Sequence, residues 1–402
     1  GTSTDVCLIR GGRVALAFEG QIAGLPNRAP QIELNTVGAG GGSIAWLDAG
    51  GFLNVGPRSA GAVPGPACYG RGGTEPTVTD ANVVLGRFRP GTPLGGEIEI
   101  DSAAAERAVA ALAERLGLST QATAEGIVRI AVTRMTGAIK EISVMRGLDP
   151  RDFTLFAFGG AGPLHAALIA AELGMREVIV PPLCGAFSAL GLLHADQRRD
   201  VSRTRLLPLH GERLETLRTI LKPMREVAAA ELELEGVDPQ RIRFECSVDM
   251  RYVGQAFELN TPLDDGIEDI EQLIERFHDL YEQRYSHTDR GEVEAVAFRV
   301  SAYAQSESPR PAAPSVSDGG LDTALLGHRE VRFEQGSEST PIYARERLPR
   351  GAHLTGPALI EEDGSVTLVP PAVELEWLED GTLRLTLAPM QRTDAPQPGN
   401  SR

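Results

Sequence analysis

Aromatic residues are scarce in this 402-residue chain, where Phe, Trp and Tyr together make up 5% of the positions. Positive charge is also in short supply, because 39 lysines and arginines face 55 aspartates and glutamates, for a formal net charge of −16. Nucleic-acid phosphates are bound by clustered Lys and Arg, so this balance argues against a general nucleic-acid surface and against binding to an anionic membrane. A protein that acts on small molecules fits the composition better.

Cysteines are few as well. The four of them are widely spaced and none forms a CxxC pair, so the sequence indicates neither a zinc ribbon nor a dithiol redox motif. Reduced, mostly buried thiols are the simplest expectation in a chain of this size, and they favour the cytoplasm. The longest apolar run, 183–193, is far shorter than the roughly 20 residues that a membrane span needs. No signal-peptide pattern is visible, so we expect a cytoplasmic protein.

Glycine and proline, by contrast, are abundant, with 45 and 27 residues. The first 60 residues predict short strands joined by glycine turns, beginning with a hairpin that turns at Gly11 and Gly12. The Gly- and Pro-rich stretch 56–80 follows, which cannot be a helix and does not favour a strand. Ordered loops of this length are usually functional, and disorder is the other common possibility.

The middle of the chain predicts two helices followed by a βαβ unit. The first helix is capped by Asp101 or Ser102 and the second by Ser119, and apolar residues recur at helical spacing after each cap. An apolar run of strand length, 153–158, then meets a glycine turn that opens into a helix ending at Gly174. A second buried strand at 177–182 completes the unit, which spans about 30 residues.

Beyond residue 200 the pattern changes to that of an α+β domain. Helices are predicted at 212–236 and 269–284, and strands at 241–252 and 294–304. The composition then predicts a linker, short strands and turns, and a disordered tail. We therefore expect an α/β domain at 1–200, an α+β domain at 201–308, a linker at 306–320, a β-rich domain at 321–389 and a disordered tail at 390–402.

The first six residues, GTSTDV, could hold a phosphate. Backbone amides of a glycine turn and the hydroxyls of Thr2, Ser3 and Thr4 can hydrogen-bond phosphate oxygens, and Asp5 could orient a magnesium ion or a water molecule. A polar turn ahead of a strand is the alternative interpretation, and a short motif alone often misleads.

The stretch 158–166, FGGAGPLHA, could hold a nucleotide, because a strand that ends in glycines and enters a helix lets the backbone approach a ligand closely. It is not a GxGxxG pattern, so a dinucleotide fingerprint is not supported. A tight packing turn is the alternative. His165 could act as a ligand or base, but a packed or capping histidine is the more common outcome at such a position.

Other stretches leave both interpretations open. The loop 56–80 gathers polar groups, including Asp80, among small residues, and the turn 38–43 could cradle phosphate or simply close a hairpin. His278 and His287 lack a recognised metal-ligand spacing, so a solvated helix face is favoured over a metal site. The stretch 251–259, RYVGQAFEL, places Arg251 and Gln255 at a strand bend, where a β-bulge alone could explain its glycine.

Taken together, these stretches resemble the large subunits of the hydantoinase/oxoprolinase family, called hydantoinase A or N-methylhydantoinase A, whose relatives include subunits of ATP-dependent ketone carboxylases. The resemblance covers nearly the whole chain and is most specific around 55–87. In order, the similar segments are 1–6 (GTSTDV), 36–51 (TVGAGGGSIAWLDAGG), 55–87 (VGPRSAGAVPGPACYGRGGTEPTVTDANVVLGR), 142–166, 185–200 (GAFSALGLLHADQRRD), 248–259 (VDMRYVGQAFEL) and 356–371 (GPALIEEDGSVTLVPP).

The resemblance implies an α/β fold like that of sugar kinases, actin and heat-shock ATPases, in which two lobes close over ATP. It implies ATP-dependent opening of a cyclic amide such as a hydantoin or 5-oxoproline, with Mg²⁺ and sometimes K⁺; a ketone carboxylase subunit or an inactive structural fragment is the alternative. A B-type hydantoinase subunit and further copies of the chain are the implied partners.

The resemblance also assigns roles to residues. It makes 1–6 the second phosphate loop and 158–166 the turn on the adenosine side. Asp80 and His165 are expected near the substrate. The residues expected to bind the cofactor are Gly1, Thr2, Ser3, Thr4, Gly159, Gly160 and Gly162, and Asp5 is expected to serve both catalysis and the metal.

In the resembling family a whole lobe with the first phosphate loop precedes the position of Gly1. The chain therefore resembles the C-terminal half to two-thirds of such a subunit, as a truncated gene product, a separately encoded chain or a shortened form of a longer one. One phosphate loop without its partner is not expected to hold ATP productively, so the isolated chain is expected to be inactive.

Overall fold

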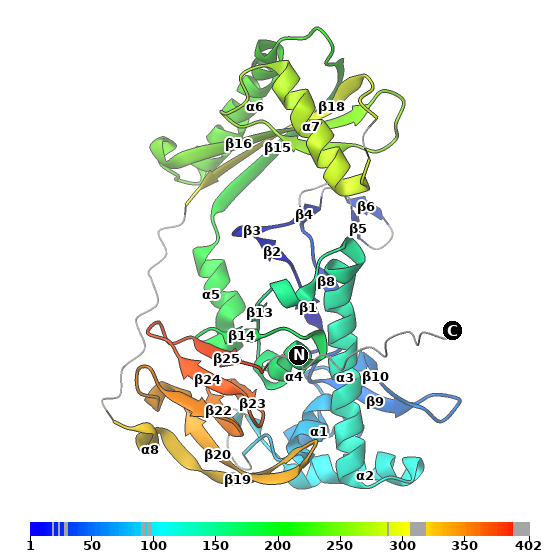
Figure 1. Cartoon of the computed structure of the whole chain (residues 1–402), viewed down its shortest axis with the longest axis vertical. Coiled ribbons are helices and arrows are strands. Elements are labelled where there is room, and N and C mark those ends of the chain that lie inside the picture. The colour runs from blue at the N-terminus through cyan, green and yellow to red at the C-terminus, as the bar shows by residue number, and fades with distance from the viewer. Residues whose placement is uncertain are drawn as a thin grey trace, which may run out of the picture. The chain divides into compact units, whose positions relative to one another are not determined.

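A computed structural model of the chain describes residues 1–17, 20–22, 25–27, 31–89, 93–94, 98–287, 289–305 and 319–388. The chain divides into two compact units, one made of 1–189 together with 311–402 and the other of 190–310. Figure 1 traces the elements of both along the chain. The expected linker lies outside the described residues except for Gly319 and Gly320, and the expected disordered tail at 390–402 lies wholly outside them. No helix of the described chain is long and apolar enough to cross a membrane.

The helices of the first unit start and end where local sequence dictates. Asp101 accepts a hydrogen bond from the Ala104 amide and Ser119 from the Ala122 amide, as the capping predictions required. Gly174 ends its helix in the left-handed conformation, which glycine adopts without strain. The α-helices are α1 (Val78–Val84), α2 (Ser102–Leu116), α3 (Thr120–Ile142), α4 (Gly162–Leu173) and α8 (Leu321–Ala324), while α5 (Phe187–His194) spans the boundary between the units.

The predicted βαβ unit is confirmed. Strand β13 (Leu155–Phe156) pairs in parallel with β14 (Glu177–Val180), and α4 connects them. The sheet continues in the order β13-β14-β25-β24-β21 with strands from the far end of the chain, namely β25 (Leu383–Thr386), β24 (Glu374–Trp377) and β21 (His353–Thr355).

This sheet departs from the expected domain plan. The residues from 321 onward are rich in strands, as expected, but they do not form a compact unit of their own. The reason is that β25 pairs with β14, so that Leu383 and Leu385 share one hydrophobic core with Val178 and Val180. A second sheet in this unit has the order β19-β20-β22-β23 and contains β19 (Leu325–Phe333), β20 (Gly336–Ala344), β22 (Ala358–Glu362) and β23 (Ser365–Val369).

The N-terminal strands are short and paired two by two. The predicted hairpin is confirmed, since Arg10 pairs with Arg13 across Gly11 and Gly12, both of which have positive φ. Pairing joins β1 to β8, β2 to β3, β4 to β7, β5 to β6, β9 to β10 and β11 to β12. The strands are β1 (Thr4–Val6), β2 (Ile9–Arg10), β3 (Arg13–Val14), β4 (Leu16–Ala17), β5 (Gly20–Ile22), β6 (Leu25–Asn27), β7 (Gln31–Ile32), β8 (Asn35–Val37), β9 (Ser43–Leu47), β10 (Leu53–Ser59), β11 (Pro93–Leu94) and β12 (Ile98–Glu99).

The second unit is the expected α+β fold, an antiparallel sheet in the order β15-β18-β16-β17 with α6 and α7 packed on it. Alternate residues of the strand predicted at 241–252 are buried, with the exception of Phe244, which is 36% exposed. Strand β15 was not predicted. The elements are β15 (Gln197–Pro208), α6 (Leu214–Leu234), β16 (Ile242–Tyr252), β17 (Leu259–Pro262), α7 (Ile270–Tyr285) and β18 (Val293–Ala304).

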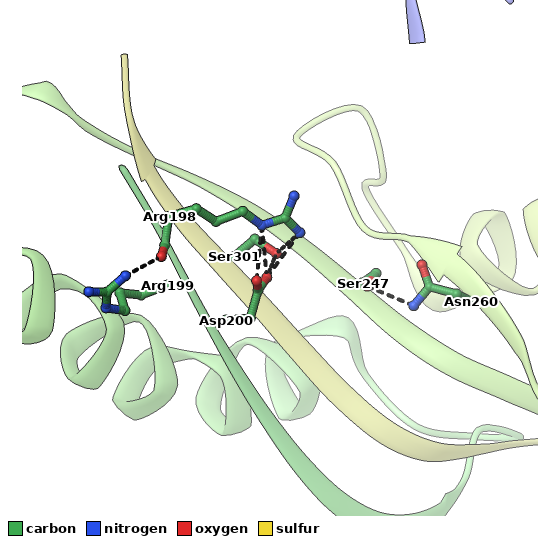
Figure 2. Close-up of polar contacts among 6 residues, drawn as sticks. All are labelled: Arg198, Arg199, Asp200, Ser247, Asn260 and Ser301. Carbon is green, nitrogen blue, oxygen red and sulfur yellow. Dashed lines mark hydrogen bonds and ion pairs between the residues drawn. The ribbon is translucent and has the colours of Figure 1, made fainter. Parts of the chain in front are cut away.

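Polar side chains on this sheet pair with one another across neighbouring strands. The Arg198 guanidinium donates to the Asp200 carboxylate and to the Ser301 hydroxyl, and the Asn260 amide donates to the Ser247 hydroxyl at 2.8 Å (Figure 2). Beside them the Arg299 guanidinium contacts Asp249 at 2.8 Å. These bonds satisfy the polar groups within the sheet itself, so they account for the cluster without a ligand.

Candidate functional site

The first residues of the chain pack into the glycine turn at 38–43. The Gly42 amide donates to the carbonyl of Gly1 at 2.9 Å, and the Thr4 hydroxyl donates to the carbonyl of Ala39 at 2.6 Å. A β-carbon built on Gly40 would lie 2.6 Å from the carbonyl oxygen of Gly1, so only glycine fits there. Two stretches that the sequence left as separate candidates therefore form one surface, and Gly1, Thr2 and Ser3 on it are exposed.

The start of α1 is joined to the same turn. Both the amide and the hydroxyl of Thr79 donate to the carbonyl of Gly41 at 2.8 Å. The Thr2 and Ser59 hydroxyls lie 3.0 Å apart, which ties the N-terminal segment to the end of β10. The loop 56–80 is thus ordered, and both of its ends hold the 38–43 turn in place.

The turn at 159–162 lies beside the turn at 38–43. A β-carbon on Gly41 would lie 2.8 Å from the Thr79 hydroxyl and 3.8 Å from the β-carbon of Ala161, so the two turns are neighbours. Gly159 has a φ of +89°, and α4 begins at Gly162 with Pro163 in its first turn. Ala161, at the cap position of α4, makes no side-chain capping bond in the described structure, which leaves the amides of the first turn for an anion.

Asp5 lies at the edge of this surface. It is exposed on β1, and one oxygen of its carboxylate accepts a hydrogen bond from the Thr36 hydroxyl at 2.6 Å. Among the described residues no group of three or more His, Cys, Asp and Glu side chains could hold a metal ion. A lone carboxylate suits Mg²⁺ that arrives with a nucleotide, because that ion is usually bound by one or two carboxylates plus the phosphates.

Asp80, which the resemblance placed near the substrate, is enclosed by the loop itself. It is fully buried, and its carboxylate accepts bonds from the amides of Ala67, Cys68 and Thr77 and from the Thr77 hydroxyl at 2.7 Å. It thereby closes a capping box at the start of α1 and holds the middle of the loop. With burial, its charge raises the pKa of the Cys68 thiol. The geometry gives Asp80 a structural role in shaping the loop.

His165, also expected near the substrate, is buried as well. Its side chain is 1% exposed on α4, and neither ring nitrogen has a hydrogen-bond partner in the described part of the chain. Burial, reinforced by the nearby Arg87 guanidinium, lowers its pKa to about 3. A histidine that is neutral and sealed from water at ordinary pH is a packed residue, which was the favoured alternative.

His278 and His287 belong to no metal-binding group among the described residues. His278 is buried, so the expectation of a solvated helix face is wrong for this residue: its Nδ1 lies 2.7 Å from the Tyr252 hydroxyl inside an aromatic cluster.

At the strand bend, Gly254 has a φ of +88° and the Gln255 amide donates to the carbonyl of Tyr252. A tight turn explains that glycine without a ligand.

The sequence missed three side chains beside the 159–162 turn, namely Cys184, Arg345 and Glu362. The Cys184 thiol donates to the Glu362 carboxylate at 2.9 Å, and the Arg345 guanidinium donates to the same carboxylate at 2.5 Å. Burial and the Glu362 charge raise the pKa of the Cys184 thiol to about 12. Residues 363 and 364 form a turn between 358–362 (ALIEE) and 365–369 (SVTLV), and nothing local linked this turn to residue 160.

The structure is thus a mixed α/β fold in which two glycine turns lie next to each other at the start of α4. Two sequence patterns identify the family. That of the hydantoinase/oxoprolinase domain matches residues 1–201, and that of the hydantoinase/oxoprolinase C-terminal domain matches residues 210–384. The chain belongs to the hydantoinase/oxoprolinase family.

Individual relatives agree. The chain is 40% identical over 351 residues to an uncharacterized protein of Methanocaldococcus jannaschii, covering 87% of this chain and 50% of that one. It is 37% identical over 398 residues to the caprolactamase subunit alpha of Pseudomonas jessenii, covering 96% of this chain and 57% of that one. It is 33% identical to 5-oxoprolinase 1 of Arabidopsis thaliana, covering 97% and 32%.

Solved structures match the fold of the whole chain. A crystal structure of ATP-dependent caprolactamase from Pseudomonas jessenii superposes with a TM-score of 0.82 at 36% identity, covering 97% of this chain and 58% of that one. A nucleotide-free structure of acetone carboxylase gives a TM-score of 0.80 at 25% identity, covering 96% and 57%. The chain spans about half the length of these two curated relatives, from Methanocaldococcus jannaschii and Pseudomonas jessenii.

Proposed function

We propose that this chain forms the second half of the nucleotide site of an ATP-dependent enzyme that opens the ring of a cyclic amide. The observation that supports this most is that residues 1–4 and the 159–162 turn both lie against the buried turn at 38–43, while Gly1, Thr2 and Ser3 stay exposed. The caprolactamase relative, whose structure is described as ATP-dependent, and the 5-oxoprolinase relative support a lactam-like substrate.

In this proposal different residues of the chain bind different parts of the nucleotide. The exposed residues Gly1, Thr2 and Ser3, together with the half-buried Thr4, bind phosphate, and Gly159, Gly160 and Gly162 admit the nucleoside. Asp5 orients a metal ion or the attacking water. Mg²⁺, when bound with ATP, neutralises charge on the transferred phosphoryl group.

The reaction proposed is phosphorylation followed by hydrolysis. The amide oxygen takes the terminal phosphoryl group of ATP and ADP leaves, which makes the ring carbon electrophilic. Water then adds to that carbon, the carbon–nitrogen bond breaks as the ring nitrogen takes up a proton, and an acyl phosphate is left. A second water hydrolyses this acyl phosphate to the carboxylate and phosphate. Positioning and charge neutralisation supply most of the rate in such phosphoryl transfers, so a rigid glycine surface suits the task.

The proposal also covers the partners of the chain and its location in the cell. A B-type hydantoinase subunit is the proposed partner, together with further copies of this chain, since the relatives include proteins called the caprolactamase subunit alpha and the acetone carboxylase beta subunit. The second candidate function is a subunit of a ketone carboxylase, which the acetophenone and acetone carboxylase relatives favour. The cytoplasm is the proposed location.

The proposal is tested by combining this chain with the remaining part of a subunit as long as its relatives and with the partner subunit. ATP hydrolysis is then followed with caprolactam, 5-oxoproline or hydantoin present. Asp5→Asn should lower the lactam-stimulated rate by two orders of magnitude or more, as roughly expected for a group that aligns metal or water. The matched control is Glu106→Gln, an exposed carboxylate on α2, which should leave the rate unchanged. Equal rates for Asp5→Asn and the control would remove the assigned role.

A further inference from the structure

A hairpin from the C-terminal part of the chain reaches the 159–162 turn. Strands β22 and β23 are joined at Asp363 and Gly364, and the Ser365 hydroxyl donates to the carbonyl of Gly160 at 3.2 Å across 205 residues of sequence. A β-carbon on Gly160 would lie 3.2 Å from the carbonyl oxygen of Gly364. Figure 1 shows β23 beside α4, the helix that this turn opens.

The same hairpin tip touches a second glycine. A β-carbon on Gly185 would also lie 3.2 Å from the carbonyl oxygen of Gly364. The segment around Gly185 is in turn bonded to the 159–162 turn, since the Gly159 amide donates to the carbonyl of Cys184 at 2.8 Å. The hairpin therefore holds the 159–162 turn twice, once through Ser365 and once through the residues around Gly185.

A buried ion pair anchors the base of the hairpin. Glu362 pairs with Arg345 at 2.5 Å, and their side chains are 11% and 6% exposed. The Arg345 guanidinium also donates to the carbonyls of Val180 and Gly381 at 2.8 and 2.9 Å, and the Cys184 thiol donates to Glu362. Because a buried charge that loses its partner is strongly unfavourable, these groups keep a single arrangement.

We propose that the β22–β23 hairpin, residues 362–365, is a clamp that positions the 159–162 turn and thereby sets the affinity for the nucleoside part of the ligand. Ser365 and Glu362 are its positioning residues. The inference rests on the proposed function, because it assigns the nucleoside to the 159–162 turn. It goes further because it separates two parts of the site. The clamp affects binding of the nucleoside but not binding of phosphate by residues 1–4 and 38–43.

This separation into a nucleoside part and a phosphate part can be tested directly on the full chain. Ser365→Ala removes one hydrogen bond, and Glu362→Gln keeps the shape of the side chain but removes its charge. The matched control is Ser337→Ala, an exposed serine on β20 of the same sheet. Two ligands are titrated with Mg²⁺ present: ADP, which has a nucleoside, and tripolyphosphate, which has none. Amide hydrogen exchange of residues 159–162 is measured without ligand.

The clamp predicts that Ser365→Ala speeds exchange at 159–162 and weakens ADP binding by about three- to tenfold, the range expected for one hydrogen bond. Tripolyphosphate affinity should stay within twofold of the original chain, and Ser337→Ala should change nothing. If the hairpin only stabilised the fold, the affinities for both ligands would fall together or neither would change. Glu362→Gln should repeat the pattern with a larger effect on ADP.

Unchanged exchange at 159–162 in Ser365→Ala would overturn the clamp, as would faster exchange with unchanged ADP affinity. Equal losses for ADP and tripolyphosphate would overturn the division of the site. If the original chain binds neither ligand, the proposed function fails for this chain, and the exchange rates still decide whether the hairpin holds the turn. The two failures are therefore distinguishable.

Discussion

Gly41 and Ala161 are neighbours although they lie 120 positions apart in the sequence: a β-carbon on Gly41 would stand 3.8 Å from the β-carbon of Ala161. That one approach joins the 38–43 turn to the 159–162 turn. It is possible because Gly41 has no side chain, for its β-carbon would also meet the Thr79 hydroxyl at 2.8 Å. The candidate site depends on this small residue.

Replacing Gly41 by Ala should therefore damage the site more than the fold. The new methyl group must displace Thr79, which holds the turn through the Gly41 carbonyl, so nucleotide affinity should fall by at least about tenfold. The measurement is calorimetric titration with Mg²⁺ and a non-hydrolysable ATP analogue.

A glycine with free space provides the control for that change. Gly137 lies inside α3, and a β-carbon there would have no atom within 4 Å. Gly137→Ala should raise the free energy of unfolding by about 0.5–1 kcal/mol and leave nucleotide affinity alone. Equal effects of the two substitutions on affinity would contradict the assignment of the 38–43 turn.

Asp80→Asn should act on stability. An amide oxygen can replace only part of the carboxylate's bonds, and its NH₂ group would face the amides of Ala67, Cys68 and Thr77. The expected loss is about 2–4 kcal/mol in the free energy of unfolding, by the usual cost of a charged, buried hydrogen-bond acceptor. Both tryptophans, Trp46 and Trp377, lie in the same compact unit, so denaturant unfolding followed by their fluorescence reports on it. Normal stability with lost catalysis would instead restore a catalytic role for Asp80.

His165 should make the first unit sensitive to acid. Its pKa is lowered from about 6.5 to about 3 by burial, so between these values the unfolded chain binds a proton that the folded chain does not. Stability therefore falls as the pH drops through this window, by at most about 1.4 kcal/mol per pH unit for one group.

Substituting His165→Leu tests that sign. The free energy of unfolding at pH 7 should be equal or higher, since a buried histidine without hydrogen-bond partners in the described chain is replaced by an apolar side chain. The stability advantage of the variant should then grow as the pH falls from about 6 to 4. An advantage that is independent of pH would mean that His165 takes up a proton in the folded chain.

The features that could be predicted from the sequence are those that neighbouring residues dictate. Asp101 and Ser119 cap helices, Gly174 ends one, and Gly11 with Gly12 turns a hairpin, each within a few positions of its partner. The βαβ unit follows from a buried strand, a glycine turn and a helix in immediate succession.

The features that escaped prediction depend on contacts between distant residues. Nothing near residue 160 indicates that Ser365 will bond to it, and nothing near 178 indicates pairing with Leu385. The resemblance placed Asp80 near the substrate, whereas its bonds to three surrounding amides depend on how the loop folds. The sequence could name candidate polar residues, but their contacts with distant residues required the fold.

Calorimetric titration of the unmodified chain with a non-hydrolysable ATP analogue and Mg²⁺, repeated on Gly160→Val, tests the central claim most directly. The account predicts binding in roughly the micromolar range that is lost in the variant, because the new side chain would press on the Gly364 carbonyl, 3.2 Å from the added β-carbon. Binding of equal strength in both proteins would contradict the assignment of the nucleoside to the 159–162 turn.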